Sequence, residues 1–216
     1  MMGYLEVKHN SRLAMDPNYP EIDEESFKPQ DWSQQYGDIK EAIPINAPAP
    51  RGKEVVLRMM VDSDHAGDTT DRRYCTGYMI FVNMALIDWL SKKQATVEKA
   101  VFGSEFVAMA HGVETLCGLC YKLRMMGVHI HGPTYVHGDN MSMIFNTSQP
   151  ESQLKKKSNS VCYHAVRESV AMKECITTHI SSLLNFSNLL TKVLYGQKRR
   201  NLVDGLMLDI YEYDLN

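Results

Sequence analysis

Three short apolar segments followed by one long amphipathic segment restrict the fold of this chain more than any other feature. Residues 55–61, 77–82 and 85–90 have the length and composition of strands, and only Asn83 and Met84 separate the last two, which suits a tight hairpin. Between residues 97 and 126, apolar side chains recur at alternating steps of four and three, as on one face of a helix. They are Phe102, Phe106, Met109, Val113, Leu116, Cys120 and Leu123. The sequence therefore predicts a three-stranded antiparallel meander followed by a helix that Gly127 ends.

The remaining segments extend this order. We expect a strand at 134–139, a short helix at 140–146, a helix at 158–174, a strand at 176–180 and a helix at 187–208. Three strands, a helix, a strand, helices, a strand and a helix predict an α/β fold in which helices flank a mixed five-stranded sheet.

The first 50 residues differ in composition from the rest of the chain. They hold six of the eight prolines, and they carry four Lys or Arg against nine Asp or Glu, whereas residues 51–216 carry 19 against 17. Proline lacks a backbone donor and favours extended chain. We therefore expect residues 1–50 to form an extended tether, with a short strand at 4–9, and residues 51–216 to form the folded domain.

Nothing in the composition indicates a membrane or a secreted protein. No run of about 18 apolar residues occurs, and the amino terminus has no basic segment followed by an apolar one. The five cysteines are an odd number, which favours reduced thiols. We expect an intracellular protein with no membrane partner.

Three acidic residues occupy positions from which their side chains could meet. Asp62 ends the first strand, Asp139 ends the strand at 134–139, and Glu105 lies in the first third of the long helix at the margin of its apolar stripe. A nuclease needs such carboxylates to hold two divalent cations against a phosphodiester, and Mg²⁺ prefers oxygen ligands. We predict that Asp62 bridges two Mg²⁺ ions, for which Mn²⁺ is an alternative, and that Glu105 and Asp139 complete their coordination.

Basic residues form short clusters in the second part of the chain. Clusters on one face could follow a phosphate backbone, while the alternative is that they are solvated loop charges. The clusters with a predicted nucleic-acid role are Lys92 and Lys93, and Lys155, Lys156 and Lys157. His164 and Arg167 lie three residues apart on one helical face. They could contact the substrate or form a structural hydrogen bond, and the sequence leaves both alternatives open.

Several short motifs occur in the order typical of one known family. They are Asp-x-Asp-x-Ala-Gly-Asp at 62–68, Arg-Arg at 72–73 with Thr-Gly-Tyr at 76–78, Trp-Leu-Ser-Lys-Lys-Gln at 89–94, Ser-Glu-Phe-Val-Ala at 104–108, Asp-Asn-x-Ser at 139–142, Tyr-His-x-x-Arg-Glu at 163–168 and Leu-Thr-Lys at 190–192. Through these motifs, which spread over about 130 residues, the chain resembles the ribonuclease H domain of copia-type retrotransposon Pol polyproteins.

The resemblance implies a metal-dependent endonuclease that cleaves the RNA strand of RNA–DNA hybrids during reverse transcription. It also implies a partner, the reverse transcriptase portion of the same polyprotein, to which a segment like residues 1–50 would connect. The implied location is a cytoplasmic particle or the nucleus.

One departure from the family pattern affects the expected activity. Where the family has a fourth acidic residue, three positions before the Thr of Leu-Thr-Lys, this chain has Asn188. An amide oxygen lacks the negative charge that two close dications need, so we expect weaker metal binding and slower cleavage. The alternatives are a catalytically impaired remnant that binds nucleic acid or serves a structural role, and an integrase-like enzyme, for which the chain lacks an obvious helical Glu after Asp139.

Overall fold

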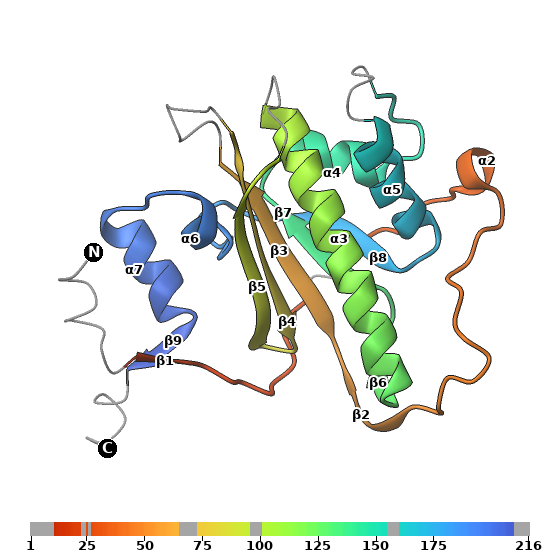
Figure 1. The fold of residues 1–216 in the computed structure, drawn as a ribbon, viewed down its shortest axis with the longest axis horizontal. Helices are drawn as coiled ribbons and strands as arrows, with labels where there is room; N and C mark the ends of the chain where they lie inside the picture. The colour runs from red at the N-terminus through yellow and green to blue at the C-terminus, as the bar shows by residue number, and fades with distance from the viewer. Residues whose placement is uncertain are drawn as a thin grey trace.

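A mixed five-stranded sheet forms the centre of the molecule (Figure 1), with the strand order β5-β4-β3-β7-β8. The computed structural model describes residues 11–22, 25, 27–64, 73–95, 101–154 and 160–209. The strands β3 (Leu57–Ser63), β4 (Cys75–Val82) and β5 (Ala85–Lys93) form an antiparallel meander. The strands β7 (Thr134–Gly138) and β8 (Cys175–His179) continue the sheet parallel to β3. This arrangement confirms the predicted fold class.

Asn83 explains a difference from the predicted strand at 55–61. It occupies the β4–β5 turn with a positive φ of 56°, and its Oδ1 accepts a hydrogen bond from the Val56 N–H at 2.9 Å. The Asn83 N–H in turn donates to the Val56 carbonyl at 2.7 Å. Both backbone groups of Val56 therefore bond to the turn residue, and the segment divides here into β3 and a separate strand, β2 (Arg51–Val55). The strand β2 pairs in parallel with β6 (Val128–Ile130), which the sequence did not predict.

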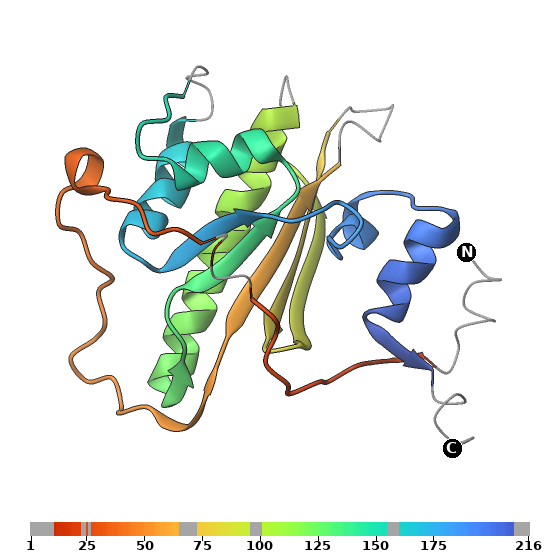
Figure 2. The same ribbon diagram turned by 180° about the vertical axis from the view of Figure 1, so that it is seen from behind.

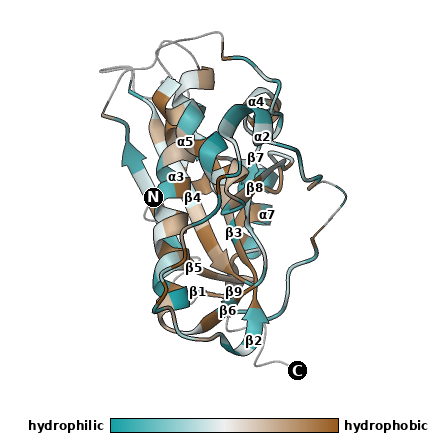
Figure 3. Cartoon of the chain, turned by 90° about the vertical axis from the view of Figure 1, so that its right-hand side faces the viewer, coloured by the Kyte–Doolittle hydropathy of each residue, from teal (hydrophilic) through white to brown (hydrophobic). Residues whose placement is uncertain are grey.

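The helix α3 (Val101–Met125) crosses one face of the sheet, together with α4 (Met141–Ser148) and α5 (Ser160–Ala171) (Figures 1 and 2). Gly127, with a φ of 78°, follows its end as predicted, while residues 97–100 of the expected helix lie outside the described part. Alternate side chains of β3 point to opposite faces, so Met59 and Val61 pack against α3 and Met60 packs on the other face. Figure 3 shows that apolar residues dominate β3.

The helix predicted over residues 187–208 is wrong in its extent. The structure has α6 (Asn188–Thr191) and α7 (Gly196–Asp204) instead. The helix α6 ends because Lys192 has an extended backbone, with φ −122° and ψ 146°. Beyond α7, the strand β9 (Met207–Asp209) pairs antiparallel with β1 (Ser11–Leu13). The helices α6 and α7 lie on the face of the sheet opposite α3 (Figure 1).

The described part of the first 50 residues contacts the sheet domain at several points. It contains the short helix α2 (Ser33–Tyr36), preceded by Trp32, whose exposed fraction is 7%. Glu41 forms an ion pair with Arg124 near the end of α3. The division of the chain at residue 50 stays a prediction, and the strand expected at 4–9 lies outside the described residues. Among the described helices, none combines the length and apolar character that crossing a bilayer requires.

Candidate metal centre

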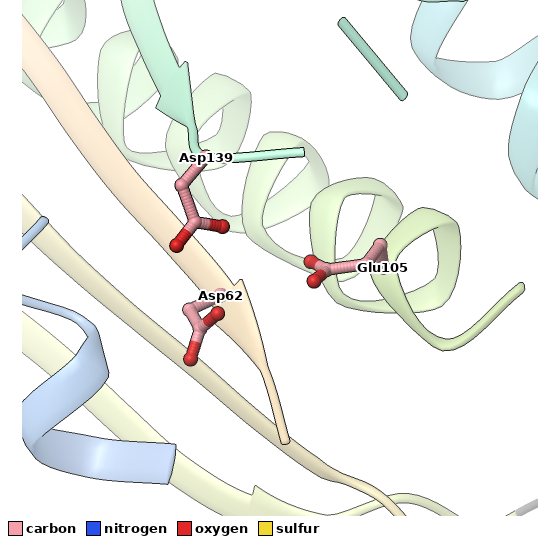
Figure 4. A group of neighbouring side chains, drawn as sticks. All are labelled: Asp62, Glu105 and Asp139. Atoms are coloured by element: carbon pink, nitrogen blue, oxygen red, sulfur yellow. The ribbon is translucent and has the colours of Figure 1, made fainter. Parts of the chain in front are cut away.

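Three carboxylates converge at one end of the sheet (Figure 4). Asp62 lies near the end of β3, Asp139 directly follows β7, and Glu105 lies on α3. Because β3 and β7 are parallel neighbours, their carboxyl ends meet at the same edge. One oxygen atom from each carboxylate lies within 4.8 Å of the others. The structure therefore brings together the three residues that the sequence singled out, and their roles as metal ligands stay predictions.

A small network of hydrogen bonds fixes the first turn of α3 against the sheet and so positions Glu105. The Ser104 Oγ lies 2.9 Å from the Ser63 Oγ. The Gln94 Nε2 donates to the Ser104 carbonyl at 2.9 Å and to the Thr76 Oγ1 at 3.0 Å. All four residues are buried. Sequence reasoning placed Ser104 and Gln94 in motifs but assigned them no positioning role.

The surroundings of Glu105 disfavour its ionised form. Burial, with the nearby charges of Asp62 and Asp139, raises its pKa to about 9, although the charge of Lys192 and a backbone hydrogen bond from Ser63 act in the opposite direction. Its Oε2 atom is buried and has no hydrogen-bond partner among the described residues. A buried, unpartnered oxygen is costly in free energy. A cation at this point would both satisfy that oxygen and favour the ionised carboxylate.

Asp62 is held from the other side by α6 and the residue after it. The Thr191 hydroxyl donates a hydrogen bond to the Asp62 Oδ2, and the Lys192 Nζ lies 2.7 Å from the Asp62 Oδ1. Burial raises the pKa of Asp62, and Lys192 and Thr191 counteract this increase. Burial alone would lower the pKa of Lys192, but attraction by Asp62, Asp139 and Glu105 outweighs it, so the pKa of this ammonium is raised.

Asn188 is fully buried beside this pair. Its Oδ1 accepts a hydrogen bond from the Lys192 Nζ at 2.9 Å. Its Nδ2 donates to the carbonyl oxygens of Ser182, at 3.1 Å, and Asn185, at 3.0 Å. The amide therefore uses both of its ends within the fold, and a carboxylate could not make the two donated bonds.

Gly77 allows α6 to lie this close to the sheet. It is the β4 residue paired with Asp62. A Cβ atom built on Gly77 would lie 2.5 Å from the Thr191 Cγ2 and 3.1 Å from the Leu190 Cβ. Only a residue without a side chain fits here, so Gly77 helps to place Thr191 and Lys192 against Asp62.

The basic residues predicted to bind nucleic acid lie in different settings. Lys92 and Lys93 are exposed at the end of β5, and the strand register places them at the same end of the sheet as Asp62. Two strand spacings separate β5 from β3, which is roughly 10 Å. The lysines at 155–157 lie outside the described residues. The sheet thus places one of the two basic clusters near the carboxylates.

His164 and Arg167 differ from each other in exposure. His164 is exposed, with its Nδ1 3.0 Å from the Tyr36 hydroxyl. The side chain of Arg167 is buried, and its guanidinium donates to the carbonyl oxygens of Asn146, Gln149 and Pro150 at 2.7–2.9 Å. These contacts favour the structural alternative for Arg167, because the same donors cannot also bind a phosphate. A nucleic-acid role for His164 stays a prediction.

Comparison with known proteins agrees with this fold and identifies relatives in sequence. The chain is 27% identical over 144 residues to the retrovirus-related Pol polyprotein from transposon RE2 of Arabidopsis thaliana, a match that covers 67% of this chain and 10% of that protein. It is 29% identical over 147 residues to the Pol polyprotein from transposon TNT 1-94 of Nicotiana tabacum, covering 68% and 11%. The chain therefore spans about a tenth of the length of these relatives. No family model matches the chain.

Solved structures show the same architecture. The N-terminal ribonuclease H domain of a Mycobacterium tuberculosis protein aligns with a TM-score of 0.50 at 10% identity, covering 70% of this chain and 96% of that one. LC11-RNase H1 in complex with an RNA/DNA hybrid aligns with a TM-score of 0.50 at 13% identity, covering 62% and 93%. The chain has the ribonuclease H fold. Its homologues are Pol polyproteins of copia-type transposons, as the motifs indicated.

Proposed function

We propose that this chain is a metal-dependent endonuclease that cleaves the RNA strand of RNA–DNA hybrids. The observation that carries the proposal is the convergence of Asp62, Glu105 and Asp139, with oxygen atoms within 4.8 Å of one another at the carboxyl ends of parallel strands. The ribonuclease H fold and the Pol polyprotein relatives support it.

The residues present fit a divalent cation. All three residues offer carboxylate oxygens, which Mg²⁺ and Mn²⁺ prefer, and the buried Glu105 Oε2 has no hydrogen-bond partner among the described residues, so it is available to a cation. A bound divalent ion would supply a water that is nucleophilic near neutral pH and would stabilise charge on the leaving oxygen. Asp62, Glu105 and Asp139 would hold it, and the bonds of Ser63 and Ser104 would keep Glu105 in place.

Substrate recognition is proposed to depend on the exposed lysines at the end of β5. Lys92 and Lys93 would contact phosphates of the hybrid, while the 2′-hydroxyl distinguishes RNA from DNA without sequence readout. The solved complex of LC11-RNase H1 shows a protein of this fold with an RNA/DNA hybrid. Replacing both lysines by Ala should weaken binding evenly across sequences and reduce its salt dependence.

The biological setting follows from the relatives and is likewise proposed. The chain would act in reverse transcription beside the reverse transcriptase portion of the same polyprotein, inside the cell, in a cytoplasmic particle or the nucleus. The match to Pol polyproteins supports this setting.

The test is cleavage of an end-labelled RNA–DNA hybrid by the full chain with Mg²⁺, beside a DNA duplex of the same sequence. We expect cleavage of the RNA strand alone, and its loss in Asp62→Asn and Asp139→Asn. Cleavage of the DNA duplex would favour an integrase-like enzyme. Cleavage of the hybrid that survives both substitutions would contradict the proposed site.

A second candidate function is hybrid binding without turnover. The observation that favours it is the fully buried Asn188 at the expected fourth acidic position. In that case the chain would retain the hybrid in a filter-binding assay and leave its RNA strand intact with either Mg²⁺ or Mn²⁺.

A further inference from the structure

The ammonium group of Lys192 already occupies one side of the acidic site. Its Nζ lies 2.7 Å from the Asp62 Oδ1 and 2.9 Å from the Asn188 Oδ1. These two oxygens belong to the first strand-end carboxylate and to the residue at the position of the family's fourth acidic residue. A cation bound between the two positions would need the space that the Nζ fills.

The side of Asp62 that faces α3 holds no such paired ammonium group among the described residues. Glu105 approaches from α3 while α6 lies on the other side of Asp62 (Figure 4). On the α3 side, the Glu105 Oε2 is buried without a hydrogen-bond partner among the described residues, and Asp139 is only partly buried. On the α6 side, Asp62 is bonded to both Thr191 and Lys192. The α3 side therefore has a free ligand atom, and the α6 side is already paired.

The charges of the site also favour one divalent cation on the α3 side and the Lys192 ammonium on the α6 side. Asp62, Glu105 and Asp139 carry three negative charges when ionised, and Lys192 carries one positive charge, which leaves two negative charges for one divalent cation to balance. A second dication would give the site a positive excess at close range, where repulsion is strong. The neutral Asn188 adds no charge to offset it.

We propose that Lys192 takes the place of the second divalent cation, so that the site binds one Mg²⁺ or Mn²⁺ ion between Asp62, Glu105 and Asp139. The inference rests on the proposed function only in taking a divalent cation as the ligand of the site. In this proposal, the Lys192 ammonium neutralises Asp62. It fills the position that a second ion would take if residue 188 were acidic and residue 192 were uncharged.

The test is the number of Mn²⁺ ions bound per full-length chain, from the free Mn²⁺ signal in electron paramagnetic resonance at pH 7.5. The wild type should bind one ion at the site. Lys192→Met combined with Asn188→Asp removes the ammonium and adds a carboxylate, and it should bind two. Lys192→Arg keeps the positive charge and should bind one, as should Lys122→Met, which removes an exposed lysine of α3.

If the wild-type chain binds any number of Mn²⁺ ions other than one, the proposal is overturned. This measurement does not depend on the folding of a variant. A double variant that is folded by circular dichroism and still binds one ion overturns it as well. Hybrid cleavage is measured separately. One bound ion without cleavage contradicts the proposed function alone, whereas cleavage with two bound ions in the wild type contradicts the role of Lys192 alone.

Discussion

Glu105 is the residue whose protonation depends most directly on a bound cation. Burial raises its pKa from 4.5 to about 9, so in the absence of metal the folded protein keeps a proton that the unfolded chain releases between these pH values. The free energy of unfolding of the metal-free protein should therefore fall as pH rises from about 5 to 9. Thermal unfolding with a chelator present measures this slope.

Glu105→Gln should remove most of that slope, because an amide has no proton to lose. Glu114→Gln changes an exposed residue of the same helix and should leave the slope intact. Added Mg²⁺ at pH 8 should raise the melting temperature of the wild type and not that of Glu105→Gln. An unchanged slope in Glu105→Gln would show that burial of this carboxyl group does not control the pH dependence.

Asn188→Asp tests the missing acidic charge at the residue scale. A carboxylate beside Lys192 should raise affinity for Mn²⁺ by about tenfold and speed cleavage of the hybrid, whatever the number of ions bound. It should also lower stability by about 1–3 kcal/mol, because the bonds to the carbonyls of Ser182 and Asn185 lose their donor. Metal titration, cleavage and denaturant unfolding measure the three effects, with the exposed Asn201→Asp as control. Unchanged affinity and rate would rule out our account of position 188.

At the scale of elements, the approach of α6 to the sheet depends on Gly77. The added methyl group of Gly77→Ala would meet the Thr191 Cγ2 at 2.5 Å, so we expect α6 to shift and the unfolding free energy to fall by about 1–3 kcal/mol. Gly118→Ala is a matched control because no atom lies within 4 Å of its Cβ position in α3, and there the change should stabilise by about 0.5–1 kcal/mol. Urea unfolding measures both, and equal effects would contradict the close packing.

The elements also show what the sequence could and could not predict. The helix α3 and the β4–β5 hairpin were predictable because a periodic apolar stripe and a two-residue turn are local signals. The division at Val56 depends on Asn83, which is 27 residues away in sequence, and no local pattern reports it. Likewise, Asp62 and Asp139 could be recognised at strand ends, whereas the bond of Lys192 to Asp62 depends on α6 packing over Gly77. The sequence could therefore predict the acidic residues of the site, but not that the Lys192 ammonium pairs with Asp62.

At the scale of the whole molecule, Trp32 connects the first 50 residues to the sheet domain. Its exposed fraction is 7%, and the Arg167 guanidinium lies 4.7 Å from its ring centroid. Trp32→Ala should lower the unfolding free energy by about 3 kcal/mol, whereas Ile45→Ala, at a fully exposed position in the same segment, should change it by less than about 0.5 kcal/mol. Denaturant unfolding of both variants measures this. A negligible loss for Trp32→Ala would favour a loosely attached tether.

The most direct test of the central claim is the anomalous difference density of crystals of this chain soaked in Mn²⁺. Our account predicts a peak within coordination distance of a carboxylate oxygen from each of Asp62, Glu105 and Asp139, the ligand type that suits Mn²⁺. The peak should disappear in crystals of Glu105→Gln. Density elsewhere on the surface, with no peak among these three carboxylates, would contradict the account.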